Sequence, residues 1–241
     1  MLTLAAEKIT QIGSFPITNT LLDTLLVDVL LIALVYYISK NAKLVPTKLQ
    51  GVIEVVMEMI YGITESVAGK KTAQIFPYFM TFFLVIILTN WSGLLPIITS
   101  VGFYEGHNFL PLFRSASTDL NFTLALALVS LVATHVMSIT SLGIKEYLSR
   151  FFSFNPFNLF IGLLELISEF TKIISFSFRL FGNIFVGEVM LGQLSAVFAF
   201  LLPIPLLAYE LAIGLLQAVI FGMLTMAFMA ILSTPHSTEE H

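Results

Sequence analysis

The sequence predicts an all-α polytopic membrane protein with five membrane-crossing helices and one interfacial amphipathic helix, in which the last two crossings form a long tilted hairpin. Of the 241 residues, 57% are hydrophobic and 11% are charged, whereas about 25% of the residues of an ordinary soluble domain are charged. The mean hydropathy is +0.96, and several apolar runs are long enough to cross about 30 Å of hydrocarbon. The predicted solvent of this chain is therefore lipid.

Charge and cysteine content exclude several classes of function. The net charge is −4 and no basic cluster is present, so the chain has no electrostatic footprint for nucleic acid. Because the sequence contains no cysteine, it has no disulfide, no thiolate metal site and no cysteine nucleophile. The four histidines are too scattered to predict a metal site by spacing. They are His107, His135, His236 and His241. We therefore expect no cofactor and no metal.

Residues 1–241 are predicted to form one integral membrane domain, and its first crossing is residues 20–39. At about 1.5 Å per residue this helix is long enough to cross the hydrocarbon, although Asp23 and Asp28 lie near its outer end. Nothing before it reads as a cleavable signal peptide. We therefore expect this crossing to be retained.

Residues 46–69 are predicted to form a helix that lies in the membrane interface. Apolar side chains recur at helical spacing on one side, and glutamates lie on another face. The apolar residues are Val52, Val56, Met59, Ile60, Ile63 and Val67, and the glutamates are Glu54, Glu58 and Glu65. Interfacial helices usually carry Lys rather than Glu on the wet face. The alternative is therefore a helix packed against a partner protein.

Residues 76–98 and 119–142 are the second and third predicted crossings, each bounded by Pro, Gly or charged residues. Seven basic residues lie in the loops after the first and third crossings, and two lie on the opposite side. By the positive-inside rule, the loops with seven basic residues are cytoplasmic. The N-terminus is then predicted to be outside and the C-terminus, after five crossings, in the cytoplasm.

Residues 156–202 and 205–233 are the fourth and fifth predicted crossings and form the hairpin. A continuous helix over residues 156–202 would extend about 70 Å, more than twice the hydrocarbon thickness. We therefore expect it either to be broken, at Gly182 or Gly187, or to lie strongly tilted against a neighbouring protein surface.

One face of residues 156–202 carries a line of polar side chains at steps of three or four residues. They are Glu165, Glu169, Lys172, Ser175, Arg179 and Asn183. Because each membrane-inserted charge costs about 2.5 to 3.5 kcal/mol, we expect this face to line an aqueous path. The alternative is a buried salt-bridge ladder in which Glu165 and Glu169 neutralise Lys172.

Arg179 is the most specific of these residues, because it lies about 15 Å along the helix from Glu169, its nearest acid on that face. A guanidinium does not release its proton at any working pH, so Arg179 cannot relay protons. It can act only as a fixed positive charge that favours an ionised carboxylate nearby and repels a migrating proton. Its predicted role is proton gating.

A second polar region is predicted in the outer half of the hairpin. Glu188 lies about 180° round the helix from Arg179, and Glu210 and Gln217 share one face of residues 205–233. Two polar regions at different depths, with an arginine between them, predict two half-channels that do not meet. The alternative role of Glu188 and Glu210 is interhelical hydrogen bonding that locks the hairpin.

Three residues outside the hairpin are further candidates. Asn90 and Asp119 are expected to extend the outer wet region. Helix packing is the alternative for Asn90, and a helix N-cap is the alternative for Asp119. His135 is a candidate for a proton path, with hydrogen-bonded packing as its alternative.

Residues 175–188 read SFSFRLFGNIFVGE, and residues 209–228 read YELAIGLLQAVIFGMLTMAF. They resemble the two signatures of subunit a of bacterial-type F-type ATP synthases, and Asp119-Leu-Asn-Phe-Thr is a supporting match. In that family the subunit is the membrane stator beside a rotating ring of c subunits, around which its last two helices tilt. The resemblance implies no ATP chemistry in this chain and no enzymatic activity of its own.

The resemblance also implies a role for each polar residue. Arg179 resembles the arginine that meets the ring carboxylate and prevents a proton short circuit between the half-channels. The residues that resemble uptake-channel positions are Asn183, Glu188, Glu210 and Gln217, and those that resemble cytoplasmic exit positions are Glu165, Lys172 and Ser175. Many members have a histidine where this chain has Glu188 or Glu210. How protons are shared there is therefore open, and a bacterial or plastid-like source is favoured over a mitochondrial one.

The implied function is that of a proton-translocating stator subunit in a bacterial plasma membrane, rather than a thylakoid or mitochondrial one. The implied partners are the c-ring, the b subunits of the peripheral stalk, the F1 sector indirectly and the lipid bilayer, with no nucleic acid. A sodium-translocating version stays open, because ion selectivity would reside largely in the ring. A self-contained ion channel or transporter is the alternative from another class.

Overall fold

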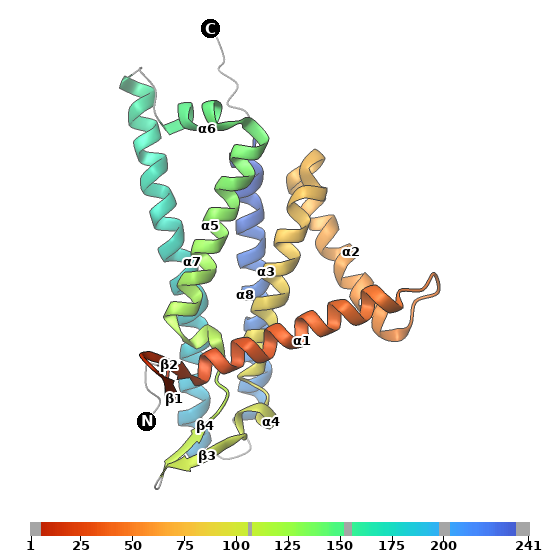
Figure 1. Cartoon of the computed structure of the whole chain (residues 1–241), viewed down its shortest axis with the longest axis vertical. Helices are drawn as coiled ribbons and strands as arrows, with labels where there is room; N and C mark the ends of the chain where they lie inside the picture. The colour runs from red at the N-terminus through yellow and green to blue at the C-terminus, as the bar shows by residue number, and fades with distance from the viewer. Residues whose placement is uncertain (1–5, 106–107, 152–155, 198–202, 235–241) are drawn as a thin grey trace.

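The computed structural model describes residues 6–105, 108–151, 156–197 and 203–234. Four helices run side by side in a bundle (Figure 1): α3 (Thr72–Ser92), α5 (Leu120–Leu142), α7 (Pro156–Val197) and α8 (Pro203–Leu232). Among the described elements, α8 packs most extensively against α3, and α7 against α5. Helix α7 also packs against α8. The two helices that carry the predicted polar residues are therefore neighbours.

An apolar core between α3, α7 and α8 holds the bundle together. Its fully buried side chains include Phe79, Ile86, Leu180, Phe221 and Met226. A side chain at Gly222 would overlap the ring of Phe79. Glycine at this position therefore lets α8 approach α3 closely, and this contact fixes the position of α8 along the bundle.

Helix α1 (Asn19–Asn41) has nearly the bounds predicted for the first crossing, 20–39. It is steeply inclined to the four bundle helices (Figure 1). Only residues near its start are buried, and they are Asn19, Thr20, Asp23 and Val27. The start of α1 is therefore anchored to the bundle, while much of its apolar surface is exposed.

Helix α2 (Lys48–Ala68) packs against α3 on part of its predicted apolar face. Ile60 is buried in the core, and Val56 and Ile63 are half-buried against it. The other apolar residues of that face are exposed: Val52, Met59 and Val67. The predicted one-sided helix is present, but its place in the membrane interface stays a prediction.

Short elements connect the helices. They are β1 (Lys8–Ile12), β2 (Phe15–Thr18), η1 (Gly69–Lys71), α4 (Pro96–Thr99), β3 (Gly102–Glu105), β4 (Asn108–Pro111), η2 (Ala116–Thr118) and α6 (Ile144–Phe151). Strands β1 and β2 pair antiparallel, as do β3 and β4. The all-α prediction missed both hairpins because strands of four or five residues are too short for their periodicity to stand out.

Helix α7 is a continuous helix of 42 residues, about 63 Å long at 1.5 Å per residue. It is not broken at Gly182 or Gly187, so that alternative is wrong. The end of the predicted crossing, residues 198–202, lies outside the described residues. The tilt of α7 in the membrane stays a prediction.

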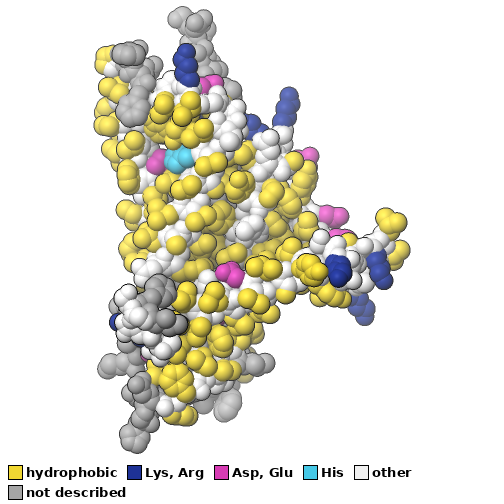
Figure 2. Space-filling view, in the orientation of Figure 1, with side chains coloured by type: hydrophobic (Ala, Val, Ile, Leu, Met, Phe, Trp, Pro, Cys, Tyr) yellow, Lys and Arg dark blue, Asp and Glu magenta, His cyan; other side chains and the backbone are white. Residues whose placement is uncertain are grey.

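Four helical segments among the described residues are long and apolar enough to cross a membrane, by length and composition. They are Asn19–Asn41, Lys48–Ser92, Leu120–Leu142 and Pro203–Leu232. Apolar side chains cover most of the visible face of the bundle, as Figure 2 shows. These features fit a polytopic membrane protein. Because Lys48–Ser92 joins α2 to α3 and α7 is not among the four, the number of five crossings stays a prediction.

Candidate ion pathway

The bundle has two ends, which Figure 1 shows. One end, with α6, the start of α7 and the end of α8, is called the α6 end. The other, with β3, β4, the end of α7 and the start of α8, is called the β-hairpin end. Arg179 lies between them, near the middle of α7.

Arg179 is exposed on α7. Its Nη2 donates a hydrogen bond of 3.4 Å to Oγ of Ser175, one turn earlier. No acidic side chain in the described part of the chain lies within 4.0 Å of its guanidinium. Phe178, the preceding residue, and Val186, two turns further on, are also exposed, so apolar side chains share the outer surface of the helix with this cation.

Toward the β-hairpin end, Asn183 and Gln217 tie α7 to α8. Nδ2 of Asn183 donates a hydrogen bond of 3.0 Å to Oε1 of Gln217, which is buried. The sequence predicted both residues in the same half-channel but not their contact. The bond fixes how α7 and α8 face each other just beyond Arg179.

Glu210 is buried on α8, with 3% of its surface exposed. Its carboxylate lies against Gly187 of α7, where a Cβ would overlap both carboxylate oxygens. Within the described residues, Oε2 of Glu210 has no hydrogen-bond partner. A buried oxygen without a partner is costly unless water or a proton satisfies it, so this carboxyl group is suited to take up a proton.

Glu188 is paired with Arg114, one of the two basic residues that the sequence places on the side opposite the basic loops. Nε of Arg114 lies 3.1 Å from Oε1 of Glu188, and Nη2 lies 3.2 Å from Oε2. In the sequence, Arg114 could have been singled out as an isolated arginine just before the third predicted crossing. Its partner was not predictable, because 74 residues separate the two.

A cavity of about 300 Å³ opens beside this ion pair. Its polar lining residues are Asn90, Thr99, Arg114, Ser115, Thr118 and Glu188. Asn90 is fully buried, and its Nδ2 donates a hydrogen bond of 3.0 Å to the Gly214 carbonyl oxygen. Asn90 thus packs against α8, as its alternative interpretation predicts, and it also lines the cavity. Its part in an outer wet region stays a prediction.

Asp119 acts as the N-cap of α5, as its alternative interpretation predicts. Its Oδ1 accepts a hydrogen bond of 2.9 Å from the Asn121 backbone N–H, and such a cap satisfies one of the free N–H groups of the first turn. Its Oδ2 accepts a hydrogen bond from Thr20 of α1. Asp119 is not among the residues that line the cavity beside Glu188.

At the α6 end, the acids of α7 are ion-paired. Glu169 pairs with Lys172 at 2.7 Å, as the salt-bridge alternative predicts. Glu165 instead pairs with Arg150 of α6 at 2.8 Å, so the predicted ladder is wrong for this residue. Sequence spacing found only the pair that lies within one helix turn.

His135 lies in a cluster between α5, α6 and α7. Its Nδ1 lies 3.1 Å from the Tyr147 hydroxyl, and its Nε2 lies 3.8 Å from Oε2 of Glu169. His135 therefore makes the hydrogen-bonded packing contact that its alternative interpretation predicts. Burial raises the pKa of Tyr147, and the nearby carboxylates add to this effect, so its hydroxyl stays protonated. The other histidines lie outside the described residues: His107, His236 and His241.

The sequence profile described as ATP synthase A chain matches residues 21–230. This chain belongs to the ATP synthase subunit a family. Subunit a of Moorella thermoacetica is 30% identical over 223 residues, which make up 92% of this chain and 94% of that relative. Subunit a of Acidothermus cellulolyticus is 31% identical over 218 residues, 88% of this chain and 75% of that relative. The resemblance found in residues 175–188 and 209–228 is confirmed.

As a member of the subunit a family, the chain is a multi-pass subunit of the membrane sector F0, which serves ion transport and ATP synthesis within a larger complex. The matched range contains every predicted pathway residue and also Arg114. The contact between Glu210 and Gly187 therefore lies within the part of the chain shared with the family.

Gly187→Ala in this subunit is expected to lower proton-driven ATP synthesis by about threefold to tenfold while the complex still assembles. The added methyl group displaces the Glu210 carboxylate. Because the sequence predicts that this carboxyl group lies on the ion pathway, we expect the displacement to slow transfer. Because a carboxylate is the end of a flexible side chain, the fold should adapt. Synthesis rates in vesicles, normalised to the amount of complex, measure the effect. Gly62→Ala is the control, since nothing lies near its Cβ position. Unchanged synthesis in Gly187→Ala would contradict the assigned contact.

Proposed function

We propose that this chain is the proton-translocating stator subunit of a rotary ATP synthase, in which Arg179 separates two offset half-channels that serve the carboxylates of a c-ring. The observation that carries the proposal is the position of Arg179. It is exposed on the outer surface of α7 and has no acidic partner in the described residues. The other charged residues of α7 are paired: Glu165, Glu169, Lys172 and Glu188.

An unpaired guanidinium at membrane depth is energetically costly, and the described residues supply no carboxylate to pair with it. A ring of c subunits, each with one membrane carboxylate, would supply it in turn. Exposed apolar residues on the outer surface of α7, such as Phe178 and Val186, offer a surface over which such a ring can turn. The b subunits of a peripheral stalk would hold this chain still against the F1 sector.

The proposed path needs no covalent chemistry. A proton enters through the cavity beside Glu188, passes Glu210 and neutralises a ring carboxylate. It travels with the ring through lipid and leaves on the side of Glu169 and Lys172, after Arg179 favours ionisation of the carboxylate. Each charge that crosses yields about 2.3 kcal/mol per 100 mV, so several are needed for one ATP.

The α6 end is proposed to face the cytoplasm of a bacterial cell. Lys71, Lys145 and Arg150 belong to the segments that connect helices there, and basic residues favour the cytoplasmic side. The cavity at the β-hairpin end then opens outward. The C-terminal end of α8 would be cytoplasmic.

The test uses the absence of cysteine from the chain. Single cysteines at Thr118 and Ser175 would probe the two half-channels with a small polar thiol reagent, which reacts only where water reaches the thiolate. We expect Thr118→Cys to react from the outer side only and Ser175→Cys from the cytoplasmic side only. Val132→Cys, on the exposed apolar face of α5, is the control and should react from neither. Labelling of one position from both sides would contradict two separate half-channels.

Two alternatives are tested by transport in vesicles. A synthesis rate that depends on sodium would indicate a sodium-translocating version of the same subunit. Ion flux through the isolated chain would indicate a self-contained channel or transporter, whereas co-purification with an oligomeric ring supports the stator.

A further inference from the structure

The two carboxylates near the outer cavity have different surroundings. Both oxygens of Glu188 accept hydrogen bonds from the Arg114 guanidinium, at 3.1 Å to Oε1 and 3.2 Å to Oε2. The Arg114 side chain is only 6% exposed. Because a guanidinium never releases its proton, this pair places a permanent positive charge beside Glu188.

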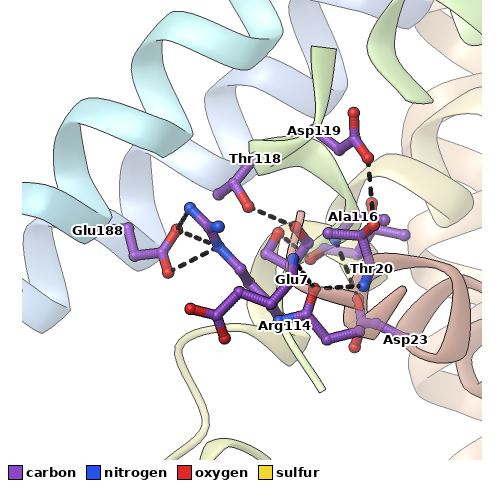
Figure 3. A network of polar contacts seen from close by, with 11 residues as sticks. Glu7, Thr20, Asp23, Arg114, Ala116, Thr118, Asp119 and Glu188 are labelled. Atoms are coloured by element: carbon purple, nitrogen blue, oxygen red, sulfur yellow. Dashed lines mark hydrogen bonds and ion pairs between the residues drawn. The ribbon is translucent and has the colours of Figure 1, made fainter. Parts of the chain in front are cut away.

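The segment that follows Arg114 is bound to the start of α1 (Figure 3). Oδ2 of Asp23 accepts hydrogen bonds from the backbone N–H of Ala116, at 3.1 Å, and from the Ser92 hydroxyl, at 2.9 Å. Ser115 donates a hydrogen bond of 2.7 Å to the Thr89 carbonyl oxygen. The segment that follows Arg114 is therefore fixed to both α1 and α3, and this anchors the backbone from which Arg114 reaches Glu188.

Glu210 has no such partner. It is 3% exposed, its Oε2 has no hydrogen-bond partner in the described residues, and no cation of the described chain lies within 4.0 Å of it. Neutralisation by a proton therefore relieves a buried charge at Glu210, whereas at Glu188 it would break the ion pair with Arg114.

We propose that Arg114 is a positioning residue that serves as the permanent counter-ion of Glu188, so that Glu188 stays ionised and Glu210 alone of the two carries the incoming proton. This assignment rests on the proposed function and divides the roles within its outer half-channel. Glu188 then balances the charge of Arg114. Together they form a neutral, polar part of the cavity lining, along which a proton can pass.

The test compares Glu188→Gln with Glu188→Gln combined with Arg114→Gln in the assembled complex. The single variant leaves a buried cation beside the path, which we expect to lower proton-driven synthesis by about tenfold. The double variant removes both charges and should recover at least about fivefold over the single variant. If Glu188 carried the proton itself, or if the pair only held α7 to its neighbours, the double variant would be as slow as Glu188→Gln. That result would overturn the proposal.

Arg114→Lys provides a second measurement that does not depend on the double variant assembling. The Glu188 carboxylate beside this position favours the charged ammonium form of lysine, whereas Arg179 has no acidic partner in the described residues. Synthesis by Arg114→Lys should therefore stay within about threefold of the unmutated rate. A fall to the level of Glu188→Gln would overturn the counter-ion role. Failure of the proposed function itself would be recognised separately, because Glu210→Gln would then transport normally. If Glu210→Gln blocks transport but the double variant shows no recovery, only the division of roles is wrong.

Discussion

Arg179→Lys is expected to lower proton-driven ATP synthesis by about a hundredfold, because a lysine ammonium cannot replace a guanidinium at this site. Lysine loses its proton readily when it is desolvated, and the barrier between the half-channels would then fail intermittently. Its single point charge also lacks the planar fork that meets a carboxylate with two hydrogen bonds. Among the described residues, the guanidinium of Arg179 makes a weak contact of 3.4 Å to Ser175 and no ion pair, so it is available to such a partner.

The measurement is ATP synthesis by reconstituted vesicles under an imposed proton gradient, normalised to the amount of assembled complex. Vesicles stripped of the F1 sector would report the passive proton leak, which should rise when the barrier fails. Lys40→Arg, at the exposed end of α1, is the matched control and should leave both quantities unchanged. Synthesis by Arg179→Lys near the unmutated rate would remove the gating role.

Glu210→Gln is expected to reduce synthesis and ATP-driven proton pumping by about tenfold to a hundredfold. Glutamine has nearly the same shape as glutamate, so it fits against Gly187 and leaves the packing of α7 on α8 intact. It cannot take up a proton, however, and so removes the one buried carboxyl group without a partner in the described residues of the outer region.

Glu210→Asp separates chemistry from shape. Aspartate keeps the proton-binding group but draws it back from Gly187 by one methylene, so its rate should lie between those of the unmutated chain and Glu210→Gln. Glu58→Gln on the exposed face of α2 serves as the control for loss of an acid. Equal rates for Glu210→Gln and Glu58→Gln would show that Glu210 only locks the hairpin.

Both predictions depend on how α7 meets α8. Arg179 and Glu210 are on different helices. Two contacts set their relative positions: the Asn183–Gln217 hydrogen bond and the packing of the Glu210 carboxylate against Gly187. The close approach of α8 to α3 at Gly222 then fixes the pair against the rest of the bundle. Small residues at these contacts thus have a positional role that their chemistry alone does not suggest.

The sequence by itself determined the helical, polytopic class, the family and the polar face of α7. Each of these follows from a local sequence pattern: apolar runs of membrane length, polar residues at steps of three or four, and short signatures around Arg179 and Gln217. Local spacing also found the Glu169–Lys172 pair and the cap at Asp119, because both interactions join residues within one helix turn.

Only the tertiary structure decided which charges are neutralised. Arg114 pairs with Glu188, Arg150 pairs with Glu165, and Glu210 is seated on Gly187, each through contacts between different elements. Such partners depend on how helices pack rather than on spacing along the chain, so no periodicity predicts them. The structure also decided that α7 runs unbroken past its glycines, because neighbouring helices pack along it and leave its backbone hydrogen bonds intact.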